Sequence, residues 1–196
     1  HAGETEDARF FIHTLKQRFS KARLHAIGYS LGANMLLKLL ASYKESSPLH
    51  SAVAVSTPLE LETCANHLNK GFAQIYQKHL LKSLKRDLLI KALHFDVQGT
   101  LGLSEQRIKS IKSIYEFDDV YTAPVHGFKD ALDYYTQSSS KQFLKDIKTP
   151  TLMIHALDDP FMPSSVLPAK EQLSSFVRLE ISQHGGHVGF VQGSIF

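Results

Sequence analysis

Hydrophobic residues recur at helical spacing near the start of the chain. Phe11, Leu15 and Phe19 follow one another every four residues, which is the spacing of one face of a helix. Acidic residues precede them between positions 4 and 7, where the helix dipole favours negative charge. The pattern predicts a helix over residues 4–19.

A strand, a sharp turn and a second helix are predicted next. Residues 24–29 form a short apolar stretch with a glycine near its end, which is typical of a buried strand. Beyond Ser30 the apolar residues return to helical spacing. These residues are Leu31, Met35, Leu36, Leu39 and Leu40.

Three more short apolar runs predict buried strands, at residues 51–56, 151–155 and 176–181. Continuous apolar runs that are separated by helical patterns favour a parallel sheet with both faces covered. The predicted fold class is therefore α/β, with a partial, mainly parallel sheet flanked by helices.

The middle of the chain, residues 59–146, is mostly helical in pattern and contains no convincing strand. We expect this range to form a helical cap that is inserted between two strands. The core would then consist of residues 1–58 and 147–196.

One predicted helix in this middle segment has a basic face and an apolar face. A lid that touches a membrane or lipid surface would show this pattern. A solvated face opposite a face that packs in the core explains the pattern better, and this is the interpretation that we favour. The residues are Lys78, Lys82 and Lys85 on the basic face and Leu81, Leu84 and Leu88 on the other.

The composition is that of an ordinary globular protein. With 196 residues, of which 43% are hydrophobic, the chain is long enough for one sizeable core. Its 22 basic and 19 acidic residues are mixed along the sequence, whereas a nucleic-acid surface needs clustered basic residues. We therefore exclude nucleic acid as a partner.

Cys64 is the only cysteine, which excludes an internal disulfide framework and favours a reducing compartment such as the cytoplasm. We expect it to pack as a small buried residue. No apolar run approaches the ~20 residues of a membrane span, and no export signal opens the chain. Because the chain begins at His1 rather than at methionine, we expect a piece of a longer protein; a processed or engineered chain is the alternative.

Gly28-Tyr29-Ser30-Leu31-Gly32 matches the pattern G-x-S-x-G. The motif lies where a predicted strand breaks directly into a predicted helix, which is the setting of a nucleophile elbow. Glycines beside such a serine let the strand and helix backbones approach, so that the hydroxyl projects from the turn. The Leu31 N–H, at the start of the helix, would donate to a developing oxyanion. An ordinary strand-to-helix turn is the alternative.

A serine hydroxyl needs a base to act as a nucleophile, normally an imidazole that a carboxylate orients. Asp158 and Asp159 follow the predicted strand 151–155, at the end where parallel sheets place their active sites. His184 and His187 lie in a glycine-containing loop after the last predicted strand. The order serine, aspartate, histidine is that of α/β-hydrolases.

Five segments of the chain carry a family resemblance. They are HAGETED at residues 1–7, GYSLGAN at 28–34, FDDVYTAPVHGF at 117–128, IHALDDPFMP at 154–163 and HGGHVGF at 184–190. On these segments the chain resembles the YheT-like group of the α/β-hydrolase superfamily, and the similarity covers essentially all its residues. The resemblance implies the α/β-hydrolase fold and hydrolysis of carboxylic esters, with relatives that act on short to medium acyl esters and some on phospholipids.

The resemblance also implies which residues act. Asp159 matches the family's acid by its distances from the end of its strand and from a later proline, and His187 matches the histidine that follows a Gly-Gly pair. Asp158 stays the alternative acid, with capping of its own loop as its other role. For His184 a structural hydrogen bond is expected. In the implied mechanism His187 takes the proton of Ser30, while Asp159 orients the imidazole.

In the family, the early strands and the loop with the second oxyanion donor lie upstream of the HAG segment. The resemblance therefore implies that this chain alone is inactive or poorly folded. An acyltransferase or thioesterase on the same fold is an open alternative, and so is a non-catalytic binding protein. The presence of Ser30, Asp159 and His187 together argues against the last of these.

Neither a metal nor a cofactor is expected. His155 lies near the candidate aspartates and Cys64 lies near His67, but neither group shows the paired spacing of a known metal site. Asp118 and Asp119 match the family's cap motif and are expected to be structural. The expected partner is a small acyl ester or a lipid substrate.

Overall fold

The computed structural model describes residues 1–190, and positions 191–196, the end of the predicted core range, lie outside the described residues. The chain divides into two compact units, and each is described by itself. The sheet unit consists of Ala2–Leu61 and the chain from Ser138 onward. The helical unit consists of His1 and Glu62–Gln137.

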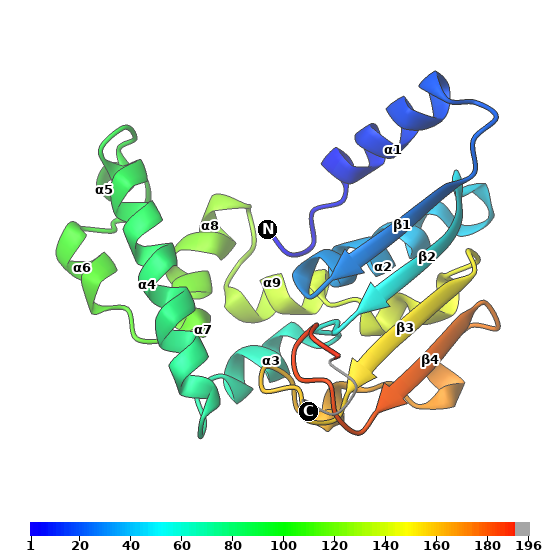
Figure 1. The fold of residues 1–196 in the computed structure, drawn as a ribbon. Helices are drawn as coiled ribbons and strands as arrows, with labels where there is room; N and C mark the ends of the chain where they lie inside the picture. Colours follow the sequence, from blue (N-terminus) through cyan, green and yellow to red (C-terminus); the bar gives the residue numbers. More distant parts are fainter. Residues whose placement is uncertain (191–196) are drawn as a thin grey trace, which may run out of the picture. The chain divides into compact units, whose positions relative to one another are not determined.

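Four parallel strands form the sheet, in the order β1-β2-β3-β4 (Figure 1). Each strand begins and ends within two residues of its predicted bounds. The predicted α/β class with a parallel sheet is therefore confirmed. The strands are β1 (Leu24–Tyr29), β2 (Leu49–Val55), β3 (Thr151–Ala156) and β4 (Val177–Ser182).

Helix α2 covers one face of this sheet. Its buried residues Leu37 and Leu40 belong to the same hydrophobic cluster as Ala52 of β2 and Met153 of β3, and helix α1 joins this cluster through Ile12. The helices of the sheet unit are α1 (Glu6–Arg18) and α2 (Leu31–Tyr43), and its short 3-10 turns are η1 (Lys44–Ser46), η3 (Lys141–Asp146), η4 (Ser164–Val166) and η5 (Lys170–Gln172).

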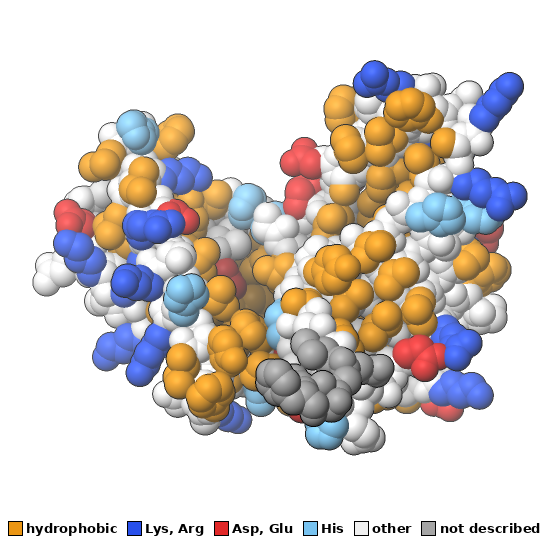
Figure 2. Space-filling view, in the orientation of Figure 1, with side chains coloured by type: hydrophobic (Ala, Val, Ile, Leu, Met, Phe, Trp, Pro, Cys, Tyr) orange, Lys and Arg blue, Asp and Glu red, His pale blue; other side chains and the backbone are white. Residues whose placement is uncertain are grey.

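The opposite face of the sheet is open within residues 1–190. Ile27 and Tyr29 of β1 keep 62% and 55% of their surface exposed. Figure 2 shows hydrophobic side chains gathered over the strands on the side that faces the reader. The expectation that both faces are covered is thus met on one face only in the described part of the chain.

The helical unit contains only helices among its regular elements, as predicted for the middle of the chain. Its own hydrophobic core includes Leu81 and Leu88 of α4, together with Ile108, Ile111 and Phe117. The elements in this part of the chain are α3 (Leu61–His67), α4 (Ala73–Ala92), α5 (Val97–Leu101), α6 (Glu105–Ser110), α7 (Ile114–Phe117), the π-helical turn η2 (Asp118–Thr122), α8 (Ala123–Val125) and α9 (Ala131–Ser138).

The helical unit is shorter than the predicted range of residues 59–146. It ends at Gln137, because Leu144 of η3 and the neighbouring Ile147 pack in the core of the sheet unit. The strands before and after this segment in sequence are β2 and β3. A role of the helical unit as a cap stays a prediction.

Asn34 is wholly buried in α2 and makes three hydrogen bonds within the sheet unit. Its Nδ2 donates to the carbonyl oxygens of Ala2 at 3.0 Å and Ser138 at 2.8 Å, and its Oδ1 accepts from the N–H of Ser140 at 2.9 Å. A buried amide whose polar atoms are all satisfied fixes the positions of its partners. Asn34 therefore ties the N-terminal segment and the segment after α9 to α2.

We expect Asn34→Ala to lower the free energy of unfolding of the full-length protein by about 2–4 kcal/mol, because three backbone groups lose their partner. Urea unfolding monitored by circular dichroism measures the change. Gln17→Ala, on an exposed position of α1, is the matched control and should change it by less than about 0.5 kcal/mol. Equal unfolding midpoints for the two variants would contradict the role of Asn34.

Candidate active site

Ser30 lies in the turn between β1 and α2, with φ of 52° and ψ of −124°. This backbone conformation is rare for a residue other than glycine and costs of the order of 1–3 kcal/mol. The Ser30 N–H donates to the carbonyl of Val55 at 2.9 Å, so the neighbouring strand β2 holds the turn. A strained serine at the end of a strand is the arrangement that the G-x-S-x-G motif predicts.

The two glycines of the motif have different surroundings. A Cβ atom on Gly28 would lie 2.7 Å from both the Cα atom of Ala33 and the carbonyl oxygen of Gly32, so only glycine fits where β1 meets α2. A Cβ atom on Gly32 would meet no atom within 4 Å among the described residues. The expected close approach of backbones therefore explains Gly28, and nothing in residues 1–190 requires glycine at position 32.

Leu31 is the first residue of α2. The N–H groups in the first turn of a helix have no acceptor within the helix and carry its partial positive charge. The Leu31 N–H directly follows Ser30 in sequence, and its role as an oxyanion donor stays a prediction.

His187 makes one contact with each of the other two predicted residues. Its Nε2 lies 3.0 Å from the Oγ atom of Ser30, and its Nδ1 lies 2.9 Å from the Oδ2 atom of Asp159. With the hydrogen on Nδ1, the imidazole donates to the carboxylate and accepts from the hydroxyl. The structure thus brings together three side chains from positions 30, 159 and 187, all of them in the sheet unit.

Asp159 is fixed from two sides. Its side chain is fully buried, its Oδ1 accepts from the N–H of Phe161 at 2.8 Å, and its Oδ2 faces His187. The ring of Phe161 stacks on the imidazole of His187, with ring centroids 4.3 Å apart. Phe161 is a contact that sequence reasoning missed, although it lies in the matching segment 154–163.

Asp158, the alternative acid, contacts the histidine loop elsewhere. Its Oδ1 accepts from the N–H groups of Gly185 at 3.0 Å and Gly186 at 2.8 Å, and its Oδ2 lies 3.3 Å from Nδ1 of His184. The Gly186 N–H is the main cause that lowers the pKa of Asp158 below its usual value, with smaller contributions from His184 and Gly185. Asp158 therefore holds the backbone just before His187, and Asp159 holds its ring.

A buried serine also holds the histidine loop. The Oγ atom of Ser56, which follows β2 and is wholly buried, accepts from the N–H of Val188 at 3.2 Å. Val188 and Phe190 both have positive φ angles, of 60° and 43°. Hydrogen bonds before and after His187 thus support a loop whose backbone is strained.

His155 lies on β3 with 3% of its surface exposed. Its Nε2 atom has no hydrogen-bond partner within the described residues. Burial lowers the pKa of His155 below 6.5, while the nearby Asp159 opposes this shift and His187 adds to it. His155 therefore stays neutral in the folded protein near neutral pH.

No group of three His, Cys, Asp or Glu side chains in residues 1–190 is placed to hold a metal ion. Within the same residues, no helix combines the length and the apolar character that crossing a membrane requires.

Asp118 accepts a 2.7 Å hydrogen bond from the Tyr135 hydroxyl, and Asp119 accepts one from the N–H of Ala131 at 3.0 Å.

The strained serine, the parallel sheet and the histidine and aspartate beyond it define an α/β-hydrolase. The chain belongs to this family, because the family model described as alpha/beta hydrolase fold matches residues 1–194. It is 46% identical over its whole length to the Escherichia coli protein named "Putative esterase YheT", and it covers 57% of that protein. The predicted resemblance to the YheT-like group is thereby confirmed.

Two more distant proteins are also similar to the chain. Monoacylglycerol lipase of Saccharomyces cerevisiae is 26% identical over 97% of the chain, which covers 43% of that protein. An acylaminoacyl peptidase, solved with a chloromethyl ketone, matches 93% of the chain and 23% of its own chain with a TM-score of 0.52 at 17% identity; this likeness shows the fold alone. The chain spans about half the length of the curated relatives it matches.

The low pKa of His155 predicts a pH dependence of stability. The unfolded chain binds a proton at this residue near pH 6.5, but the folded chain does not, so stability is fully present above this pH and is lost as the pH falls through it. We expect His155→Gln to flatten the fall in unfolding free energy between about pH 7.5 and pH 5. Urea titrations at a series of pH values measure this slope.

The control for this experiment is His94→Gln, because His94 is exposed on the helical unit. The control should keep the slope of the unchanged protein. An unchanged slope in His155→Gln would show that the buried imidazole does not cause the fall in unfolding free energy at acid pH.

Proposed function

We propose that the protein is a serine hydrolase that cleaves carboxylic esters, with Ser30 as nucleophile, His187 as base and Asp159 as the acid that orients the base. The observation that carries the proposal is the pair of contacts of the imidazole, 3.0 Å to the Ser30 hydroxyl and 2.9 Å to Asp159. Both distances are within the range for proton transfer and orientation.

The reaction follows in two steps. His187 takes the hydroxyl proton while Oγ of Ser30 bonds to the ester carbonyl carbon, and the Leu31 N–H donates to the oxyanion. The alcohol leaves with the proton from His187 and an acyl-serine remains. Water then attacks this acyl group, His187 accepts the proton of the water and returns it to Oγ, and the carboxylic acid leaves.

The names of relatives support an ester as the substrate class. One is named an esterase and another a monoacylglycerol lipase. Short to medium acyl esters are the proposed substrates, and thioester hydrolysis or acyl transfer to an alcohol is the alternative on the same residues.

The single cysteine, Cys64, is the observation behind a cytoplasmic location, which stays a prediction.

Ser30→Ala in the full-length protein should lower kcat/KM for acyl esters by at least about 10³-fold, because the nucleophile is lost. It should also abolish covalent labelling by a fluorophosphonate probe. Turnover of p-nitrophenyl esters of graded acyl length measures the first effect, and mass spectrometry of the labelled peptide measures the second. Ser165→Ala, at an exposed serine, should keep both, and retained turnover in Ser30→Ala would reject the assignment.

The two aspartates give a second test. Asp159→Asn should lower kcat by about 10⁴-fold with little change in KM, because the imidazole loses the carboxylate that fixes its tautomer. Asp158→Asn keeps an oxygen for the N–H groups of Gly185 and Gly186 and should retain most of the activity. A larger loss in Asp158→Asn than in Asp159→Asn would exchange the two roles.

A further inference from the structure

The side of helix α4 that does not pack in the core of the helical unit carries large exposed hydrophobic residues at both ends of the helix. Phe72 and Ile75 near its start are 69% and 58% exposed, and Ile90 and Leu93 near its end are 51% and 80% exposed. An apolar residue on a solvated helix face normally stands alone. Here four of them fall on one stripe, because positions 72, 75, 79, 82, 86, 90 and 93 are three or four residues apart.

Basic residues occupy the middle of the same stripe. His79, Lys82 and Arg86 are all exposed. Arg86 pairs with its neighbour Asp87 at 2.8 Å. In the part of the chain that the structure describes, neither Lys82 nor Lys78 beside it forms an ion pair with an acidic side chain. The centre of the stripe therefore presents positive charge to whatever it meets.

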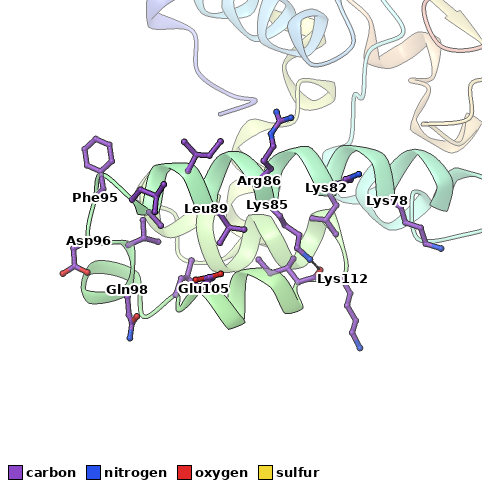
Figure 3. Close-up of a pocket in the computed structure, with 17 residues that line it drawn as sticks. Lys78, Lys82, Lys85, Arg86, Leu89, Phe95, Asp96, Gln98, Glu105 and Lys112 are labelled. Carbon is purple, nitrogen blue, oxygen red and sulfur yellow. Dashed lines mark hydrogen bonds between the residues drawn. The ribbon is translucent and has the colours of Figure 1, made fainter.

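A groove of about 1050 Å³ runs along α4 next to the stripe (Figure 3). Apolar side chains such as Leu81, Leu89 and Ile111 line it, and Lys78 and Lys82 lie along it. The acidic residues in its lining already have partners. Asp96 accepts from the N–H of Gly99 at 2.7 Å, and Glu105 pairs with Lys109.

The structure changes the balance between the two interpretations of this helix. The favoured one, a solvated face opposite a core face, accounts for Leu81 and Leu88, which are buried, and for part of the basic face. It does not account for Lys85, which is half buried and donates to the carbonyl oxygen of Ile111 at 2.9 Å. Nor does it account for the exposed apolar residues at the two ends of the helix.

We propose that this side of α4 docks on the surface of a bilayer that contains anionic phospholipids. The α4 surface is defined as Phe72, Ile75, Lys78, Lys82, Arg86, Ile90 and Leu93. The lipid surface fits because α4 is one uninterrupted helix of 20 residues, or about 30 Å, so that a flat layer can meet the whole stripe. Apolar side chains at the ends enter the boundary of the acyl chains, while the lysines between them reach the phosphates on long flexible stems.

The basic residues of the α4 surface favour an anionic bilayer over a neutral one. Lysines without acidic partners are attracted to anionic headgroups, and each basic residue near such a surface raises binding roughly fivefold. The attraction weakens as salt screens it. The α4 surface therefore distinguishes an anionic bilayer from a neutral one. This inference concerns the helical unit alone and does not depend on the proposed reaction.

The test is cosedimentation of the full-length protein with vesicles of ether-linked phospholipids, which contain no ester to cleave. Vesicles of phosphatidylcholine with about 30% phosphatidylserine should bind it, and pure phosphatidylcholine vesicles should bind it much less. Lys78→Glu with Lys82→Glu should weaken binding to the anionic vesicles by at least about 25-fold. Leu93→Ser should also weaken it, because an inserted side chain is lost.

Matched controls lie outside the α4 surface. Lys145→Glu with Lys148→Glu makes the same change in charge at exposed positions of the sheet unit, and Leu132→Ser removes an exposed leucine from α9. Both should bind vesicles as the unchanged protein does. Equal binding by the Lys78 and Lys82 double variant, or no binding of the unchanged protein to anionic vesicles, would overturn the proposal; the second result would point to a protein partner.

Turnover of a short water-soluble ester keeps the two proposals apart. The Lys78 and Lys82 double variant should cleave it like the unchanged protein, because the α4 surface contributes no residue to the proposed mechanism. Vesicle binding without any ester turnover would reject the proposed reaction and leave the α4 surface standing. Ester turnover without vesicle binding would reject the α4 surface as a membrane-docking site and leave the proposed reaction standing.

Discussion

Parallel pairing of the four strands is the constraint on which the candidate site depends. In a parallel sheet all strands point the same way, so their carboxyl ends meet at one edge. Ser30 directly follows β1, Asp159 comes three residues after β3 and His187 five residues after β4. Residues 157 positions apart in sequence thereby come within hydrogen-bonding distance, because each of the three residues follows the end of its own strand closely.

The neighbouring residues Asp158 and Asp159 hold different parts of the histidine loop. Asp159 is buried and contacts the imidazole ring, whereas Asp158 is exposed and contacts the backbone of Gly185 and Gly186. A ring is oriented well only if its backbone is also held, because a small shift of the loop moves the imidazole away from the hydroxyl. Consecutive carboxylates at the end of one strand supply both contacts.

The sequence predicted the features that depend on local patterns. The strands, the elbow at Ser30 and the candidates Asp159 and His187 follow from apolar periodicity, from the motif and from the family resemblance. Contacts between distant residues outside the motif and the family resemblance were not predictable, since no local signal links Asn34 to Ser138, Phe161 to His187, or Ser56 to Val188. The periodicity of α4 indicated a basic face, but only exposed surface areas revealed the hydrophobic residues on the same side.

The backbone conformation of Ser30 affects which substitutions are favoured at this position during evolution. Its positive φ angle makes the position one where glycine would give a more stable fold than serine. A lineage that no longer needed a hydroxyl there would gain stability by losing it. Serine at this position therefore lowers the stability of the fold. In a relative that no longer catalyses the reaction, replacement of this serine by glycine is the expected change.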